Sequence, residues 1–319
     1  MKRRHIPGST LEVSEICLGT GGFGATTDLE TSFAMLDRFV ERGGNFLDTA
    51  NVYSDWIPGE KSRSEKTIGK WLKARGNRQE IVLATKGAHP RLETMHISRM
   101  SEKEIVFDLD QSLESLQTDW IDLYWLHRDD PNRSVQEILE TLNDQVKAGK
   151  IRFFGASNWT LERLRLAQDY ATSHGIQGFV ADSVLWNVAV VNVDDIADKT
   201  TTTMNATLED YHRSTGLAAV PYTSQANGLF NKMLDGTLNQ MDSNLRRPYP
   251  LAPNLERFKQ IQNIMQESNL SLTQVVLGYL LSQPFVTTPI IGPRTLPQLE
   301  DSLSAAGVQL SNAQLEVLR

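Results

Sequence analysis

The stretch NFLDTANVYS, Asn45 to Ser54, decides how this chain folds. It begins as an apolar, strand-like run, reaches a carboxylate at Asp48, and places a phenol at Tyr53 shortly afterwards. The same pattern recurs further along the chain, where other apolar runs also stop on polar side chains. These runs are IVLATK, which ends at Lys86, IDLYWLH, which ends at His127, and RFFGASN, which ends at Ser157 and Asn158.

Parallel strands explain why polar side chains stand at the ends of these runs. In a barrel of parallel strands the carboxyl ends open on one face, where residues distant in sequence meet around one substrate. Strand-like and helix-like runs alternate along the chain, as in a parallel sheet covered by helices. We therefore predict an α/β fold, a (β/α)8 TIM barrel, formed by residues 1–319 as a single domain. Its strands are expected at residues 15–20, 45–50, 81–86, 121–127, 152–158, 178–186, 217–224 and 288–293.

Helices are predicted between these strands from apolar spacing, capping residues and glycine stops. Asp28, for example, is a good N-cap for a helix over residues 28–42, which Gly43 ends. The remaining helices are expected near residues 67–76, 101–116, 134–149, 160–173, 208–216, 254–268, 271–282 and 295–306.

Several segments lie outside this alternation. Residues 2–14 alternate around Pro7 and Gly8, which predicts a small hairpin that plugs the bottom of the barrel. Residues 88–100 are expected to form an irregular loop on the active face. The polar segment 191–206 and the proline-containing segment 230–253 are predicted to be loops that shape a substrate site.

Composition narrows the possible partners. The 319 residues include 32 basic and 39 acidic side chains, a formal charge of −7 that is spread without long runs, so nucleic acid is not an expected partner. No apolar run approaches the ~18 residues of a membrane helix, and no apolar segment follows the basic N-terminus. We therefore expect a cytoplasmic protein without a membrane anchor. The single cysteine, Cys17, forms no internal disulfide.

The polar residues at the strand ends suit proton transfer to a carbonyl oxygen. Tyrosine is a poor acid at its ordinary pKa of about 10, and a neighbouring ammonium such as that of Lys86 would lower this value. Asp48 would keep the lysine charged, and His127 would form a hydrogen bond with the substrate oxygen. None of these groups donates hydride, so reduction requires a nicotinamide or similar cofactor.

The chain closely resembles the aldo-keto reductase superfamily, from about Arg4 to Ala306. The resemblance implies a (β/α)8 barrel that interconverts aldehydes or ketones with alcohols using a nicotinamide cofactor. It also implies a catalytic tetrad of Asp48, Tyr53, Lys86 and His127, with Tyr53 as the proton donor. The motifs that carry it are GTGGFG at 19–24, FLDTANVYS at 46–54, TK at 85–86, DLYWLH at 122–127 and GASN at 155–158.

The resemblance further implies a nicotinamide site. Ser157 and Asn158 match the pair that holds the carboxamide, and Tyr222 matches the aromatic residue that stacks on the nicotinamide ring. Ser183 stands where the family usually has a glutamine. The remaining cofactor positions are Gly21, in the glycine-rich run where a ligand can approach the backbone, and Gly228, which is kept although YTSQANG replaces the common YSPLGxG.

The adenosine end of the cofactor is expected after the last strand. Arg294 lies two residues beyond Gly292, where many family members place a basic residue against the 2′-phosphate of NADP. A guanidinium can bind a phosphate through two hydrogen bonds. Gln298 matches a neighbouring adenosine-binding position, and Ser302 stands where an asparagine is usual. The resemblance therefore predicts NADP(H) in preference to NAD(H).

Four further residues stand beside the tetrad or the cofactor positions and are predicted to line a substrate pocket. The pocket would accept a small apolar or sugar-like carbonyl or alcohol compound. Arg128 would attract an anionic substrate, or alternatively form a local ion pair with Asp129 or Asp130. The predicted pocket residues are Phe23, Trp56, Arg128 and Trp159.

Other classes of protein remain as alternatives. A Schiff-base aldolase would use Lys86 as its nucleophile, although a partner such as Asp48 keeps a lysine protonated. A metal-dependent hydrolase is disfavoured because the six histidines do not fall at ligand spacing, and no metal site is expected. A regulatory subunit that binds the cofactor as a sensor is the remaining alternative, since the superfamily includes such proteins.

Overall fold

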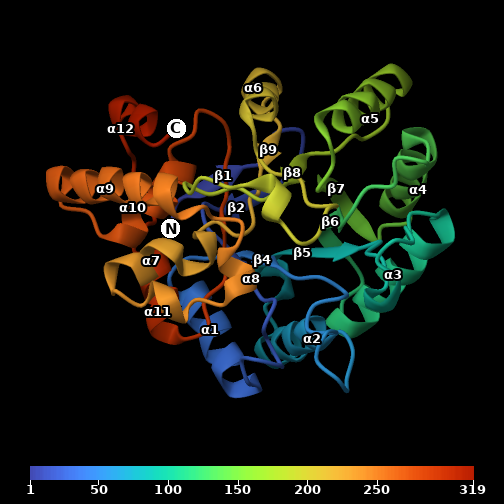
Figure 1. Ribbon diagram of the computed structural model, residues 1–319. Helices are drawn as coiled ribbons and strands as arrows, with labels where there is room; N and C mark the ends of the chain where they lie inside the picture. Colours follow the sequence, from blue (N-terminus) through green and yellow to red (C-terminus); the bar gives the residue numbers. More distant parts are fainter.

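The computed structural model describes residues 1–319 and is built around one parallel sheet (Figure 1). The eight strands follow the order β10-β3-β4-β5-β6-β7-β8-β9. A parallel bridge between Ala219 and Thr287 closes the ring, and the amide of Ile290 donates to the carbonyl of Pro221 at 2.9 Å. The predicted barrel is therefore confirmed. Its strands are β3 (Cys17–Gly19), β4 (Phe46–Asp48), β5 (Val82–Gly87), β6 (Ile121–Leu126), β7 (Ile151–Ser157), β8 (Ala181–Ser183), β9 (Ala218–Ala219) and β10 (Ile290–Ile291).

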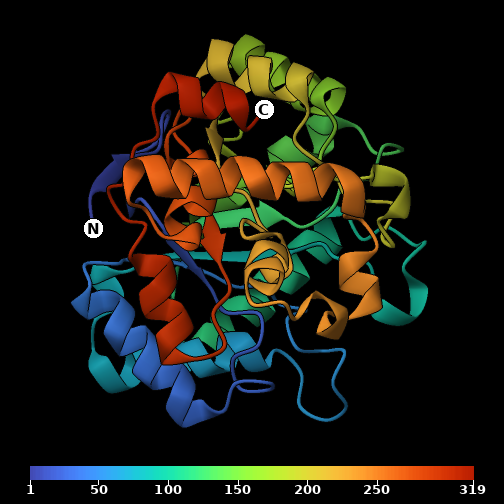
Figure 2. The ribbon, with the colours of Figure 1, turned by 60° about the vertical axis from the view of Figure 1, so that its left-hand side comes forward.

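Helices surround the barrel, and α9, the longest, runs across the outside of the molecule (Figure 2). The predicted cap of the first helix is present, because Asp28 Oδ1 accepts from the Thr31 amide at 2.7 Å. None of these helices combines the length and the apolar character that crossing a membrane requires. They are α1 (Leu29–Glu41), α2 (Arg63–Arg75), α3 (Glu102–Leu116), α4 (Val135–Lys147), α5 (Leu161–His174), α6 (Ala206–Thr215), α7 (Leu229–Leu234), α8 (Ser243–Arg246), α9 (Leu251–Ser268), α10 (Leu272–Leu281), α11 (Leu296–Leu303) and α12 (Asn312–Val317).

The N-terminal hairpin covers one end of the barrel. Strands β1 (Arg3–His5) and β2 (Glu12–Ser14) pair antiparallel, and Ile6 and Val13 pack into the cluster of side chains that fills the barrel interior. Asn45 joins the hairpin to β4, since its Oδ1 accepts from the Ser14 amide at 2.7 Å and its Nδ2 donates to the Glu12 carbonyl at 2.9 Å. The predicted plug is confirmed.

Two expectations about local structure were wrong. The second helix begins at Arg63 rather than near Thr67, because the polar side chains of its first turn point inward and are buried. Segment 230–253 is not simply a loop, because it contains most of α7, all of α8 and the start of α9. Pro250 caps α9 and Pro253 lies in its first turn, where a proline costs no helical hydrogen bond.

Candidate active site

The strand ends bring the predicted tetrad together on one face of the barrel. Asp48 ends β4, Lys86 lies near the end of β5, and His127 directly follows β6. Tyr53 lies in the turn that follows β4, where its amide donates to the carbonyl of Ala50 at 3.1 Å. This turn places the phenol of Tyr53 near the end of β5, within hydrogen-bond distance of Lys86.

Lys86 is the centre of the arrangement. Its Nζ donates to the Tyr53 hydroxyl at 3.0 Å, to the carbonyl of Thr49 at 2.9 Å, and to Asp48 Oδ2. The lysine and aspartate side chains are almost fully buried. Burial alone would lower the pKa of Lys86, but Asp48 and then Tyr53 outweigh it and raise the pKa above the ordinary value. Lys86 is therefore a charged ammonium whose three protons all have acceptors.

The pKa of the Tyr53 phenol differs from the expectation. Burial raises its pKa above the ordinary value, and the Lys86 ammonium opposes that rise without reversing it. Asp48 also raises the pKa, because its negative charge offsets part of the field of the lysine. The expected lowering of the Tyr53 pKa toward working pH is thus wrong for this structure. Tyr53 is therefore protonated at neutral pH.

His127 lies beside the phenol, with its ring edge-on to Tyr53 at a centroid distance of 5.9 Å. Burial, followed by the nearby charge of Arg128 and then His89, holds the pKa of His127 well below its ordinary range. Its Nδ1 is buried and has no hydrogen-bond partner. The neutral imidazole can therefore donate one hydrogen bond to a substrate oxygen without adding a charge.

His89 is a neighbour of the site that the sequence did not reveal. Its ring centroid lies 4.7 Å from that of His127, and its Nδ1 lies 2.6 Å from the carbonyl of Pro90, so Nδ1 carries the proton. Burial and the charge of Arg128 lower its pKa to about 4, which leaves it neutral. Its position shortly after Lys86 in an irregular loop was the only signal in the sequence.

The predicted nicotinamide residues also converge. Asn158 has a left-handed backbone with φ of 62°, donates through Nδ2 to Ser157 Oγ at 3.1 Å, and accepts from the Tyr222 hydroxyl at 2.6 Å. Ser183 lies on the adjacent strand, where its carbonyl accepts from the Asn158 amide at 3.1 Å. Its hydroxyl is buried without a hydrogen-bond partner. Gly21 lies beside the tetrad, since a Cβ added there would contact the Tyr53 ring at 3.9 Å.

Gly228 and the residues predicted for the adenosine end lie around α7 and α11. Gly228 caps α7 with φ of 78°, and Gly292 has open space where a side chain would begin. Arg294 is exposed, and its amide donates to Gln298 Oε1 at 2.8 Å while its guanidinium has no carboxylate partner. Ser302 instead faces inward, where its hydroxyl donates to Gln225 Oε1 at 3.4 Å.

The four predicted pocket residues separate into two groups. Trp56 is 56% exposed and lies edge-on to Tyr53 at 6.4 Å. Arg128 also lies at the site. The structure places Phe23 and Trp159 in the hydrophobic core instead, both fully buried, so they do not border accessible space.

The ion pair suggested for Arg128 has a different partner. Arg128 Nη2 binds Asp198 Oδ2 at 2.7 Å, and Asp198 comes from the segment that follows β8. Asp129 pairs with Arg163 at 2.9 Å instead. Sequence neighbours were therefore the wrong partners, because residues from distant segments, Asp198 for Arg128 and Arg163 for Asp129, pair with these charges instead.

Comparison with known proteins agrees with this geometry. The model of the "Aldo/keto reductase family" matches residues 15–319. The chain belongs to the aldo/keto reductase family. Norsolorinic acid reductase B of Dothistroma septosporum is 30% identical to this aldo/keto reductase, over 98% of this chain and 79% of the relative. An uncharacterized oxidoreductase of Bacillus subtilis, YrpG, is 32% identical over 100% of this chain and 95% of the relative. An aryl-alcohol dehydrogenase [NADP(+)] of Phanerodontia chrysosporium is 30% identical over 99% of this chain and 84% of the relative.

This aldo/keto reductase also contains a buried acid behind Lys86. Glu65, in the first turn of α2, accepts a hydrogen bond from Thr85 Oγ1 at 2.6 Å, and its other oxygen is buried without a partner. Burial raises the pKa of Glu65 from 4.5 to about 7. The folded reductase thus binds this proton more tightly than the unfolded chain. The resulting stabilisation is complete below pH ~4.5 and is lost as the pH rises through about 7.

Glu65→Gln is accordingly expected to stabilise the reductase at alkaline pH. Near pH 8 the free energy of unfolding should rise by about 1–3 kcal/mol, because the variant has no carboxylate to keep ionised in the core. Near pH 4.5 the gain should largely disappear. Urea unfolding at the two pH values measures the difference, with the exposed Glu267→Gln in α9 as the control. An equal effect of Glu65→Gln at both pH values would contradict the assigned titration.

Proposed function

We propose that this protein reduces an aldehyde or ketone with NADPH, and that Tyr53 donates the proton. The observation that carries the proposal is the 3.0 Å hydrogen bond from Lys86 Nζ to the Tyr53 hydroxyl, made by a lysine that Asp48 holds charged. This contact stabilises the phenolate that remains after proton transfer. The same residues would catalyse the reverse reaction, alcohol oxidation.

The protein's own groups account for orientation and proton transfer. The substrate oxygen would accept hydrogen bonds from the Tyr53 hydroxyl and from neutral His127, which lie on the same side of the site. Protonation by Tyr53 would then leave its oxygen facing the Lys86 ammonium. A bound nicotinamide supplies the hydride, which no side chain in the site can donate.

The residues around β7 and β8 fit the nicotinamide end of such a cofactor. Ser183 Oγ is a buried hydroxyl without a partner, which suits a carboxamide donor. Asn158 and Ser157 would hold the same group, and the ring of Tyr222 lies beside them. Gly228 and Gly292 would let phosphate or ribose approach the backbone.

Preference for NADP(H) rests on Arg294, whose guanidinium is exposed and unpaired just before α11. Arg294→Ala is expected to weaken NADPH binding by about 10- to 150-fold and to leave NADH nearly unchanged, because a charge-assisted contact to the 2′-phosphate is worth roughly 1.5–3 kcal/mol. Quenching of protein fluorescence by each cofactor measures both affinities. Equal losses for the two cofactors would show that Arg294 does not recognise the 2′-phosphate.

Turnover distinguishes this proposal from a cofactor sensor on the same fold. NADPH oxidation should be followed spectrophotometrically with aromatic and aliphatic aldehydes, ketones and sugars, and repeated with NADH. Many turnovers per protein molecule are expected from an enzyme. Binding of NADPH without turnover of any carbonyl compound would favour the sensor. A Schiff-base aldolase is disfavoured, because all three protons of Lys86 Nζ are engaged and leave no free lone pair.

A further inference from the structure

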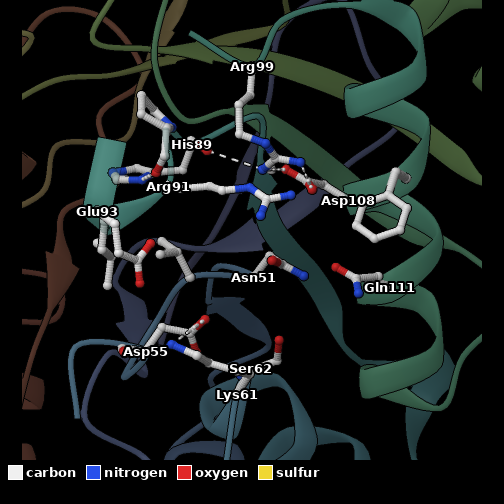
Figure 3. Close-up of a pocket in the computed structure, with 15 residues that line it drawn as sticks. Asn51, Asp55, Lys61, Ser62, His89, Arg91, Glu93, Arg99, Asp108 and Gln111 are labelled. Atoms are coloured by element: carbon white, nitrogen blue, oxygen red, sulfur yellow. Dashed lines mark hydrogen bonds and ion pairs between the residues drawn. The ribbon is translucent and has the colours of Figure 1, made fainter. Parts of the chain in front are cut away.

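A cavity of about 390 Å³ lies beside the tetrad, between the segments that follow β4 and β5 and the helix α3 (Figure 3). No tetrad residue lines it, but Asn51 and His89 do. The Asn51 amide donates to the carbonyl of Lys86 at 2.9 Å, and the His89 ring contacts that of His127. The cavity is therefore within reach of a substrate whose carbonyl group lies at Tyr53.

Most of the charged side chains around the cavity neutralise one another. Arg99 binds Asp108 with its Nη2 at 2.6 Å from Oδ1, and Lys61 lies 3.8 Å from Asp55. The side chain of Arg91 makes no hydrogen bond or ion pair, and its guanidinium extends into the middle of the cavity (Figure 3). Arg91 is thus the cation of this wall that remains available to a ligand.

Two side-chain amides add donors to the same cavity. Asn51 Nδ2 is buried without a hydrogen-bond partner, and Gln111 reaches the same space from α3 (Figure 3). An unsatisfied buried donor is costly, so a ligand acceptor at this place would be favoured. His89 is neutral, and its ring contacts that of His127, so it adds no charge to this wall of the cavity.

We propose that this cavity binds a carboxylate at the far end of the carbonyl substrate, through Arg91 with the amides of Asn51 and Gln111. The proposal rests on the proposed carbonyl reduction and adds a substrate class, carbonyl compounds with a terminal carboxylate. One unpaired guanidinium matches one negative charge. A doubly charged phosphate would meet the carboxylates of Asp55, Asp108 and Glu93 on the same walls.

Arg128 is less suited to this role, although it lies closer to the tetrad. Its guanidinium already binds Asp198 at 2.7 Å and the carbonyl of His127 at 2.7 Å. Recruiting it would require breaking the ion pair with Asp198. Arg91 needs no such rearrangement, because it has no partner to leave.

The test compares linear aldehydes that end in a carboxylate with the matching amides, over a series of chain lengths. Wild-type protein with NADPH is expected to show a kcat/KM about 10-fold higher for the acid than for the amide at the chain length that spans the two sites. Arg91→Gln should remove this preference and change kcat/KM for the amide by less than about 2-fold. Arg91→Lys should retain part of the preference, because it keeps the charge.

Two further variants separate a local contact from a general charge effect. Glu93→Gln removes an unpaired carboxylate of the cavity and should increase the preference for the acid. Lys73→Gln removes a positive charge from the exposed face of α2, outside the cavity, and should leave the preference unchanged. Equal kcat/KM for acid and amide in the wild type, or equal losses in Arg91→Gln and Lys73→Gln, would overturn the proposal.

A binding measurement keeps this test independent of catalysis. Isothermal calorimetry with a linear dicarboxylate, in the absence of cofactor, should give an affinity that Arg91→Gln weakens by about 10-fold and Lys73→Gln does not. If neither aldehyde is turned over but this difference is found, carbonyl reduction fails and the carboxylate site stands. If turnover occurs and the dicarboxylate binds the wild type and Arg91→Gln equally, the carboxylate site fails alone.

Discussion

Tyr53→Phe is expected to lower kcat for carbonyl reduction by roughly 100- to 10,000-fold, the range that a positioned general acid contributes. The change removes the proton that the substrate oxygen would receive, and it keeps the ring that lies edge-on to His127. Cofactor affinity should remain within about 2-fold, because the phenol is assigned no contact with the cofactor. Stopped-flow or steady-state oxidation of NADPH measures the first effect, and fluorescence titration measures the second.

Tyr170→Phe is the matched control for this variant. Tyr170 lies on α5 and donates its hydroxyl to Glu140 at 2.7 Å, on the outside of the barrel. It should retain wild-type kcat and cofactor affinity, so a loss limited to Tyr53→Phe follows from the site and not from loss of a hydroxyl in general. Wild-type turnover by Tyr53→Phe would mean that another group donates the proton.

Lys86→Met is expected to remove most activity and also to destabilise the protein. The side chain of Asp48 is 1% exposed, and loss of the Lys86 ammonium leaves this buried carboxylate without its partner. Breaking a buried ion pair in this way costs about 3–5 kcal/mol of unfolding free energy. The pKa of Tyr53 should rise further without the ammonium, so any residual reduction should persist to higher pH.

The double variant Lys86→Met with Asp48→Asn separates these two effects. Replacing the carboxylate removes the uncompensated charge, so urea unfolding should recover most of the lost stability. Activity should not return, because no ammonium faces the phenol of Tyr53. Recovery of activity together with stability would show that Lys86 acts through folding alone, and a pH–rate profile unchanged from wild type would contradict its effect on the Tyr53 proton.

The order of strands and helices could be predicted because it depends on local patterns. Apolar runs, caps such as Asp28 and glycine stops identify the elements, and parallel strands place their carboxyl ends on one face. Asp48, Lys86 and His127 were therefore expected together before any contact was known, and the structure brings them together. Helix boundaries were less well predicted at α2, where inward-facing polar residues resembled a loop.

Side-chain environments depended on contacts between distant parts of the chain. The pairing of Arg128 with Asp198 joins residues separated by 70 positions, and no local pattern indicates it. Trp159 stands next to Asn158, a predicted cofactor residue, in sequence but packs in the core. The cavity around Arg91 likewise needs walls from two loops and α3, so its shape could not be inferred from either loop.

The sequence by itself determined the barrel, the face on which the site lies and the residue types that meet there, because strand periodicity and strand direction are properties of short segments. Only the tertiary structure decided which groups are buried and which charges have partners. The pKa of Tyr53 shows why, since burial raises it while Lys86 and Asp48 act in opposite directions. Each of these contributions depends on distances and exclusion of water, and both are set by the packing of the whole barrel.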